Sequence, residues 1–286
     1  MKGVAHQAQR HVTKSVALHS STQSLPDCQA AFQRIAKRCV KLIRSQRKAA
    51  IAADPDAIHT MRIELTRLRS AVLFFSPMTD DEVWPKLNKE LRWLNSALGK
   101  ARDHDVTANY ARRKRYRKWA KSSRQGLLRA QRKVDRRLSN KLASARYERL
   151  TTTVNHWITD GPWLRADRSV RSERVDVYAQ ARLHAWRVMI SREGRHLRIL
   201  QRKQLHRLRI QCKRYRYVVA ALRGLGVALA RQDLKFVEIA KQVHGALGDL
   251  RDLKRLRRVA HGRPPGYRNS KKKLLLRAKK PFRHEP

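Results

Sequence analysis

One helical pattern that occurs twice constrains the fold of this chain more than any other feature. In residues 58–75, apolar side chains recur at alternating steps of three and four: Ile58, Met61, Leu65, Leu68, Val72 and Phe75. Such spacing puts them on one face of an α-helix, which another helix must cover. A polar stripe begins one residue further on, about 100° round the helix axis. This first stripe therefore borders the buried face, and it consists of His59, Arg62, Thr66 and Arg69.

The second copy of the pattern occupies residues 205–222. Its apolar face consists of Leu205, Leu208, Cys212, Tyr215, Val219 and Leu222. Its polar residues form the second stripe, which consists of His206, Arg209, Lys213 and Arg216.

A shorter motif follows each copy. Leu98-Gly99 with Arg102-Asp103 is matched by Leu247-Gly248 with Arg251-Asp252. Two matched elements in the same order predict an internal duplication. We therefore expect an all-α fold made of two related antiparallel helical bundles.

These motifs give the chain a family resemblance. The helix pattern H-x-x-R-x-x-x-x-R-x-R followed by L-G-x-x-R-D, present twice, resembles the CHAD family, the conserved histidine α-helical domain, over residues 27–261. The resemblance implies two pseudo-symmetric bundles with a basic groove or pore between them. It also implies binding of inorganic polyphosphate and association with polyphosphate granules. Thr66 departs from the family pattern, which usually has a basic residue there, as the second copy has at Lys213.

The charge of the chain indicates the class of its partner. Its 286 residues include 68 Lys and Arg against 22 Asp and Glu, for a formal net charge of +46. So large a surplus predicts a polyanionic partner, which could be nucleic acid, polyphosphate or an anionic surface. Hydrophobic residues make up 41% of the chain, which predicts a folded core and excludes a wholly disordered basic protein.

Cysteine usage and hydropathy indicate the compartment. Cys28, Cys39 and Cys212 are far apart and odd in number, so neither a disulfide scaffold nor a zinc ribbon is expected. No signal peptide is recognised, and the most apolar run, residues 217–230, is interrupted by Arg223 and too short to span a membrane. We expect a cytoplasmic protein without a membrane partner.

Composition and periodicity divide the chain into five segments. Their predicted extents are a mobile tail over 1–24, a first helical bundle over 25–159, a linker over 160–174, a second helical bundle over 175–261 and a basic disordered tail over 262–286. Within the bundles, we expect one helix to end just before Gly99 and another just before Gly248. Residues 103–158 read as helix with a break near Ser122-Ser123 or Gly126.

The two stripes are the candidate binding site. Arginine presents a planar fork of donors that suits phosphate oxygens, and residues three and four apart on a helix can hold successive phosphates. A solvated basic face is the alternative, but the position beside the core and the repetition favour a site. The predicted polyphosphate-binding residues are His59, Arg62, Arg69, His206, Arg209, Lys213 and Arg216. The family resemblance adds Arg67, Arg102, Arg214 and Arg251.

The histidines and acidic residues predict no catalytic chemistry. We expect His59 and His206 to donate hydrogen bonds to phosphate, with a pKa raised by the bound anion. A structural role, phosphorylation and metal ligation are the alternatives. Residues Asp103, Asp105, Asp249 and Asp252 are expected at helix starts, where they cap the helix or hold an Arg. The sequence has no P-loop and no G-x-S-x-G or H-x-x-x-H pattern, so we expect neither an enzyme nor a cofactor or metal.

Sequence-independent nucleic-acid binding is the competing hypothesis. The basic run over residues 112–149, with Tyr116 and Trp119 interleaved, suits DNA or RNA phosphates. Against it, aromatic residues make up only 6% of the chain, and no RRM, KH or helix-turn-helix signature occurs. A third hypothesis, a scaffold recruited to granules by its basic surface, overlaps with polyphosphate binding.

Overall fold

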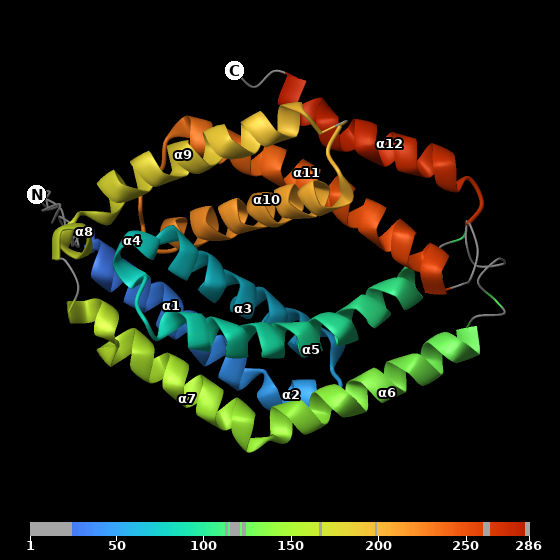
Figure 1. Ribbon diagram of the computed structural model, residues 1–286, viewed down its shortest axis with the longest axis horizontal. Helices are drawn as coiled ribbons and strands as arrows, with labels where there is room; N and C mark the ends of the chain where they lie inside the picture. The colour runs from blue at the N-terminus through green and yellow to red at the C-terminus, as the bar shows by residue number, and fades with distance from the viewer. Residues whose placement is uncertain are drawn as a thin grey trace, which may run out of the picture.

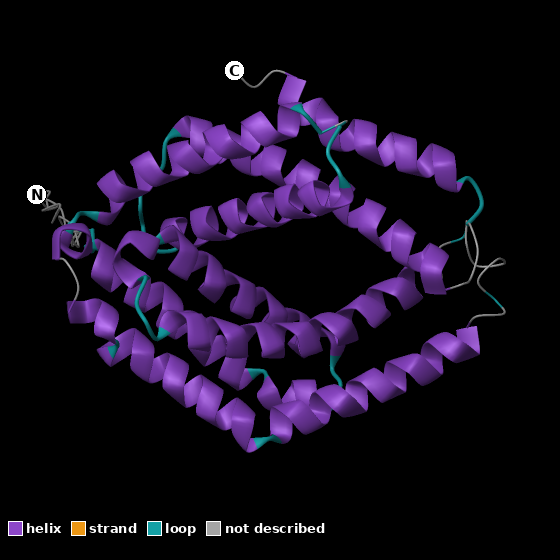
Figure 2. Ribbon diagram, viewed as in Figure 1, coloured by secondary structure: helices purple, strands orange, loops and turns teal. Residues whose placement is uncertain are grey.

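The described part of the chain is entirely α-helical in its regular structure. The computed structural model describes residues 25–111, 114, 121, 124–165, 168–197, 199–259 and 264–283. Over these residues there is no strand, and one isolated antiparallel β-bridge joins Asp27 to Arg174 (Figure 2). The all-α prediction is confirmed. The predicted tail over residues 1–24 lies outside the described residues.

The helices fall on two sides of the molecule (Figure 1). One side holds α1 (Cys28–Ser45), α2 (Arg47–Ile51), α3 (Pro55–Phe74), α4 (Ser76–Thr79), α5 (Trp84–Ala111), α6 (Arg124–Ala143) and α7 (Ala145–Asp160). Two short elements follow, η1 (Pro162–Arg165) and α8 (Arg168–Ser172). The other side holds α9 (Val175–Arg195), α10 (Arg202–Arg223), α11 (Arg231–Val259), α12 (Tyr267–Lys279) and η2 (Lys280–Arg283).

Helix α3 carries the first stripe, and local sequence explains where it begins. The Asp54 carboxylate accepts hydrogen bonds from the backbone N–H groups of Asp56 and Ala57, both at 2.8 Å. Pro55 occupies the first helical position, where its missing N–H needs no partner. The apolar face is buried as predicted, since Ile58, Met61, Leu65 and Leu68 are at most 1% exposed.

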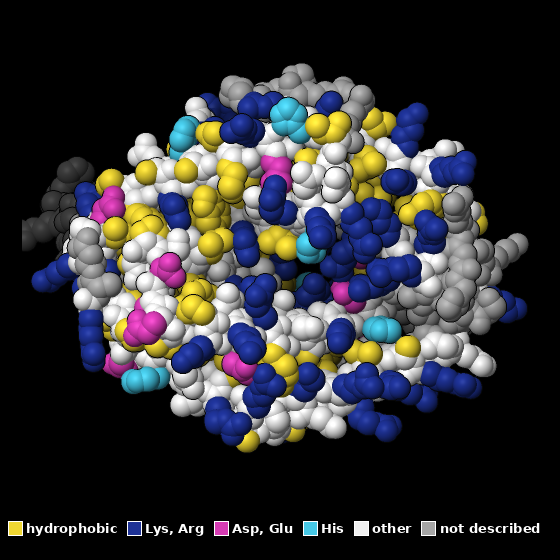
Figure 3. All heavy atoms as spheres, in the orientation of Figure 1, with side chains coloured by type: hydrophobic (Ala, Val, Ile, Leu, Met, Phe, Trp, Pro, Cys, Tyr) yellow, Lys and Arg dark blue, Asp and Glu magenta, His cyan; other side chains and the backbone are white. Residues whose placement is uncertain are grey.

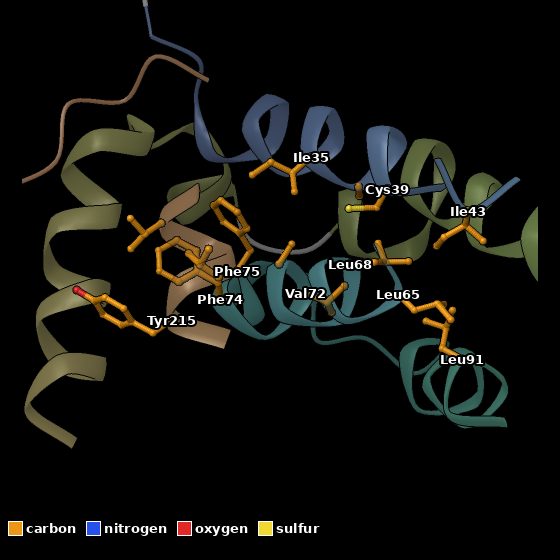
Figure 4. Packing of buried hydrophobic residues seen from close by; sticks show 14 of the residues in the cluster. Ile35, Cys39, Ile43, Leu65, Leu68, Val72, Phe74, Phe75, Leu91 and Tyr215 are labelled. Atoms are coloured by element: carbon orange, nitrogen blue, oxygen red, sulfur yellow. The ribbon is translucent and has the colours of Figure 1, made fainter. Parts of the chain in front are cut away.

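The buried faces meet in one core. Figure 4 shows Ile35 and Cys39 of α1 facing Leu65 and Leu68 of α3. The core continues into α10 through Tyr215, which is fully buried. Because α3 and α10 each bury one face in this core, neither helix can rotate about its axis. The side chains of each polar stripe therefore stay at the edge of the core.

Two predicted helix ends are wrong. Helix α5 continues through Gly99 to Ala111, and α11 continues through Gly248 to Val259. The predicted break in residues 103–158 is present, because α5 ends at Ala111 and α6 begins at Arg124, two residues before Gly126; Ser122-Ser123 lies outside the described residues. A second break lies at Ser144, whose hydroxyl accepts a hydrogen bond from the Tyr147 N–H at the start of α7.

The described parts of the segments at 160–174 and 262–286 are more ordered than the sequence suggested. The linker contains η1 and α8, and Trp163 within it is fully buried. The prediction of a disordered C-terminal tail is wrong for residues 267–283, which form α12 and η2. Phe282 is 3% exposed, packed against Gly194 of α9, so this segment belongs to the core.

The cysteines and the hydropathy of the helices agree with the sequence analysis. All three cysteines are free and buried. Among the residues that the structure describes, no helix combines the length and apolar character that a membrane span requires.

Candidate anion-binding site

The two stripes meet where α3 and α10 touch. The Lys213 ammonium of the second stripe donates a hydrogen bond to the Thr66 hydroxyl of the first stripe, at 3.4 Å. The same ammonium lies 5.1 Å from the centre of the Tyr217 ring, and the Arg67 guanidinium lies 5.5 Å from that centre. Sequence reasoning placed Thr66 and Lys213 at matching positions, and the structure places them in contact.

The two motif glycines give the stripe arginines a surface to lie on. A Cβ atom added to Gly99 would lie 4.0 Å from Nε of Arg62, and one added to Gly248 would lie 3.6 Å from Nε of Arg209. Glycine inside a helix costs about 1 kcal/mol relative to Ala, so a packing role offsets a real penalty. Arg62 thus lies against the backbone of α5, and Arg209 lies against the backbone of α11.

Asp103 of α5 joins the two sides of the molecule. Its carboxylate accepts hydrogen bonds from Arg251 and, at 2.7 Å, from Arg255, both on α11. Arg62 of α3 lies 4.0 Å from the same carboxylate. Burial raises the pKa of Asp103, but the Arg255 hydrogen bond and the charge of Arg251 outweigh it and hold the pKa below its usual value.

The expected roles of the acidic residues are half right. Asp103 and Asp105 lie inside α5, and Asp249 and Asp252 lie inside α11, so none caps a helix start. The expectation that such residues hold an Arg is confirmed for Asp103, and Asp249 pairs with Arg277 of α12 at 2.5 Å. The error has the same cause as the misplaced helix ends, since both motif glycines lie mid-helix.

A basic cavity of about 440 Å³ lies between α5, α10 and α11. Figure 3 shows a hollow near the centre of the molecule, in the region between α10 and α5, with Lys and Arg side chains around it. Three of the predicted site residues line the cavity: His206, Arg209 and Arg251. Five cations that the sequence analysis did not select also line it: Arg202, Lys203, Lys254, Arg255 and Arg258. The spacing of Lys254, Arg255 and Arg258 at three or four residues from Arg251 or from one another along α11 was the signal available in the sequence for these three.

Crowded cations depress one another's proton affinity at this site. Burial, followed by the charges of Arg62 and Arg209, lowers the pKa of Lys213 to about 7. Burial and the charge of Arg251 lower the pKa of Arg209 to about 10. Burial is likewise the largest cause of the lowered pKa of Arg62. An anion placed here would relieve that repulsion, which is the electrostatic signature of a site built for negative charge.

Three histidines face these cations. Burial and then the charge of Arg102 lower the pKa of His59, and burial and then the charge of Arg209 lower that of His206. His244 of α11 was not selected from the sequence. Burial and the charge of Arg209 lower its pKa to about 3, and its buried Nε2 atom has no hydrogen-bond partner. All three rings are therefore neutral at pH 7 without an anion, and protonation on anion binding stays a prediction.

The remaining predicted residues, Arg67, Arg69 and Arg214, do not line the cavity. Arg67 pairs with the buried Glu64, and Arg69 donates to the Asn88 side chain at 3.0 Å, so both guanidinium groups already have protein partners. Arg214 is close enough to Arg69 to lower its pKa, after burial. Among the described residues, no group of three or more His, Cys, Asp or Glu side chains is arranged to hold a metal ion.

Comparison with known proteins agrees with this architecture. The family model described as CHAD domain matches residues 34–261. A crystal structure of the CHAD domain from the plant Ricinus communis superposes with a TM-score of 0.75 at 20% sequence identity, over 92% of this chain and 93% of that one. No curated protein matches the sequence.

Proposed function

This chain belongs to the CHAD family, and from that premise we propose that it binds inorganic polyphosphate without hydrolysing it. The family resemblance supplies the identity of the polyanion, because a net charge of +46 attracts any polyanion. The ligand would lie across the first and second stripes, with Arg62, Arg209 and Lys213 as its main contacts. We further propose that the protein acts in the cytoplasm, at polyphosphate granules.

One observation carries the proposal: the contact between Lys213 and Thr66 brings the two stripes to one place. A linear chain of phosphates is flexible and carries charge at every unit, so it can follow cations arranged on crossing helices. Duplex DNA is stiff and broad, and a cavity of about 440 Å³ between α5, α10 and α11 suits it poorly. Direct arginine contacts to phosphate oxygens need no base readout, which agrees with the absence of nucleic-acid motifs in the sequence.

The site suits binding better than catalysis. The carboxylate that lines the cavity, Asp103, has a lowered pKa and is paired with Arg251 and Arg255, so it is a poor general acid at pH 7. The neighbouring histidines have lowered pKa values as well. We therefore propose a protein that holds its ligand through charge-assisted hydrogen bonds and releases it unchanged.

The test removes two stripe arginines and leaves nearly all of the charge. Replacing Arg62 and Arg209 by Ala should weaken binding of long-chain polyphosphate by at least tenfold, about 1.4 kcal/mol, measured by calorimetry at fixed salt. Binding of a DNA duplex by the same variant should barely change. A thermal melt checks that the variant folds.

A second candidate function has its own observation. Helix α6 carries an exposed row of cations, Arg132, Lys133, Arg136 and Arg137, which a nucleic-acid backbone could contact. The matched control is therefore Arg132→Ala with Arg136→Ala, which removes the same charge from another face. If this control weakens polyphosphate binding as much as the stripe variant does, binding is diffuse and the polyphosphate site is refuted. If it weakens only DNA binding, both surfaces have separate ligands.

A further inference from the structure

We propose that the basic cavity between α5, α10 and α11 holds the terminal phosphates of a phosphate chain, so that the chain is bound in one direction. This inference rests on the proposed function and makes it more specific. Its starting point is a difference in charge between the two halves of the molecule. The residues that differ lie outside the repeated motifs.

The second half is basic where the first half is not. The two halves can be aligned by matching His206 to His59 and Arg251-Asp252 to Arg102-Asp103. In this alignment, each cavity cation has a counterpart in the first half. The cavity cations are Arg202, Lys203, Lys254, Arg255 and Arg258. Their counterparts are Pro55, Asp56, Asp105, Val106 and Asn109. Five cations therefore correspond to two carboxylates and three uncharged residues, so the second half is much more basic at these positions than the first.

The cavity also presents donors that lack a protein partner. Among the described residues, Nε of Arg209 and Nη1 of Arg255 are buried without a hydrogen-bond partner. Leaving such a charged donor unpaired is costly, so these two atoms point to a ligand rich in acceptor oxygens. The first turn of α10 lines the same cavity through Arg202 and Lys203, and it contributes the positive end of the helix dipole.

The charge density selects the end of the chain over its interior. A terminal phosphate has a second ionisation near pH 6 and carries about −1.5 to −2 at pH 7, as a phosphate monoester does, whereas an interior phosphate has a single ionisable oxygen. Burial, followed by the charges of Lys271 and Arg202, lowers the pKa of Lys254, so cations are crowded on this side too. The terminal phosphate, which carries the most charge, therefore binds most favourably in the cavity, where the cations are most crowded.

Asp103 occupies one side of this cavity as a resident anion. It pairs with Arg251 and Arg255 and holds both guanidinium groups in position, while Nε of Arg209 and Nη1 of Arg255 keep no hydrogen-bond partner among the described residues. The cavity therefore remains assembled without ligand, which reduces the entropy lost when phosphate binds. Lys254 and Arg258 have no such carboxylate among the described ion pairs, so their charges remain available to the ligand.

The experiment compares ligands with and without chain ends. Linear tripolyphosphate has two terminal phosphates, whereas tetrametaphosphate is a ring with similar charge and none. Calorimetry should show that the wild-type protein binds tripolyphosphate at least tenfold more tightly than the ring. The variant Lys254→Gln with Arg258→Gln should lose at least tenfold of its tripolyphosphate affinity. Both side chains lie outside the core, so the fold should be retained, as a thermal melt would show.

A matched control sits on the same helix. Arg231→Gln with Lys235→Gln removes equal charge from exposed positions near the start of α11, away from the cavity, and should change tripolyphosphate affinity less than twofold. Equal losses in both double variants, or equal wild-type affinity for the ring, would overturn the inference. Long-chain polyphosphate binding by the wild type separates the two proposals. If that binding is absent, the proposed function fails. If that binding is present while the cavity variant binds tripolyphosphate as tightly as the wild type does, only the chain-end inference fails.

Discussion

Lys213 should make the proposed polyphosphate binding depend on pH in a way that a single substitution can test. Its ammonium group faces Arg62 on α3, Arg209 and Arg216 on α10, and Arg251 and His244 on α11. Burial and these charges lower its pKa to about 7 in the empty site. A bound polyanion favours the charged ammonium and should return the pKa toward the usual value for Lys, near 10.4. Binding above pH 7 must therefore be accompanied by proton uptake.

The magnitude follows from the shift. Each pH unit above the pKa of the empty site costs up to about 1.4 kcal/mol of binding free energy, as long as the complex stays protonated. Between pH 6 and pH 8.5 the affinity should fall by about 2 kcal/mol, or roughly thirtyfold, because of Lys213 alone. The sign is fixed by linkage. The complex holds the proton more tightly than the free protein does, so affinity is greatest below pH 7 and falls as the pH rises.

Lys213→Arg is the matched perturbation. Arginine keeps its charge across this range, so the variant should bind with little pH dependence between 7 and 8.5. Calorimetry in two buffers of different ionisation enthalpy should show close to one proton taken up by the wild type at pH 8.5 and none by the variant. The histidines do not obscure this difference, because the wild type and the variant share His59, His206 and His244, whose pKa values are all lowered in the empty site.

The ligand titrates as well, but it does so equally with the wild type and with the Lys213→Arg variant. Subtracting the two measurements therefore removes the contribution of the ligand. Lys213→Met gives a second comparison, with weaker binding and an equally flat pH profile. An unchanged pH slope in both variants would refute the assignment of the proton to Lys213.

Three further outcomes are expected from other parts of the structure. Gly194→Ala should lower the melting temperature, because a Cβ there would overlap the Phe282 ring and detach η2 from α9; an unchanged melt would contradict the docking of the C-terminal segment. Asp81→Ala should lower the unfolding free energy by about 3 kcal/mol in a denaturant titration, because the carboxylate caps α5 at two backbone N–H groups and accepts two more hydrogen bonds, from an indole and a backbone N–H. Thr66→Arg should tighten polyphosphate binding by up to about 1.5–3 kcal/mol, less the entropy of ordering the side chain, because it adds a cation beside Lys213; no gain by calorimetry would mean that this position does not contact the ligand.

Much of the site could be found from spacing alone. The alternation of three and four steps identified the buried faces of α3 and α10, and the residue after each apolar position identified the stripe beside it. These are local properties, because helix geometry fixes which residues share a face. The misplaced helix ends at Gly99 and Gly248 show where local reasoning stops. Glycine usually marks a helix end, and only the arginine packed on each one explains why it lies inside a helix.

The sequence by itself determined the fold class, the buried faces, the composition of both stripes and the sign of the net charge of the chain. Tertiary structure alone decided which cations share one place. Arg255 and Arg258 are ordinary surface cations in the sequence until α11 packs against α5 and α10 around a common cavity. His244 and Asp103 acquire their lowered pKa values only in that setting, because burial and charge act through space. Periodicity is set by neighbours along the chain, whereas electrostatics depends on distances between helices that the chain folds together.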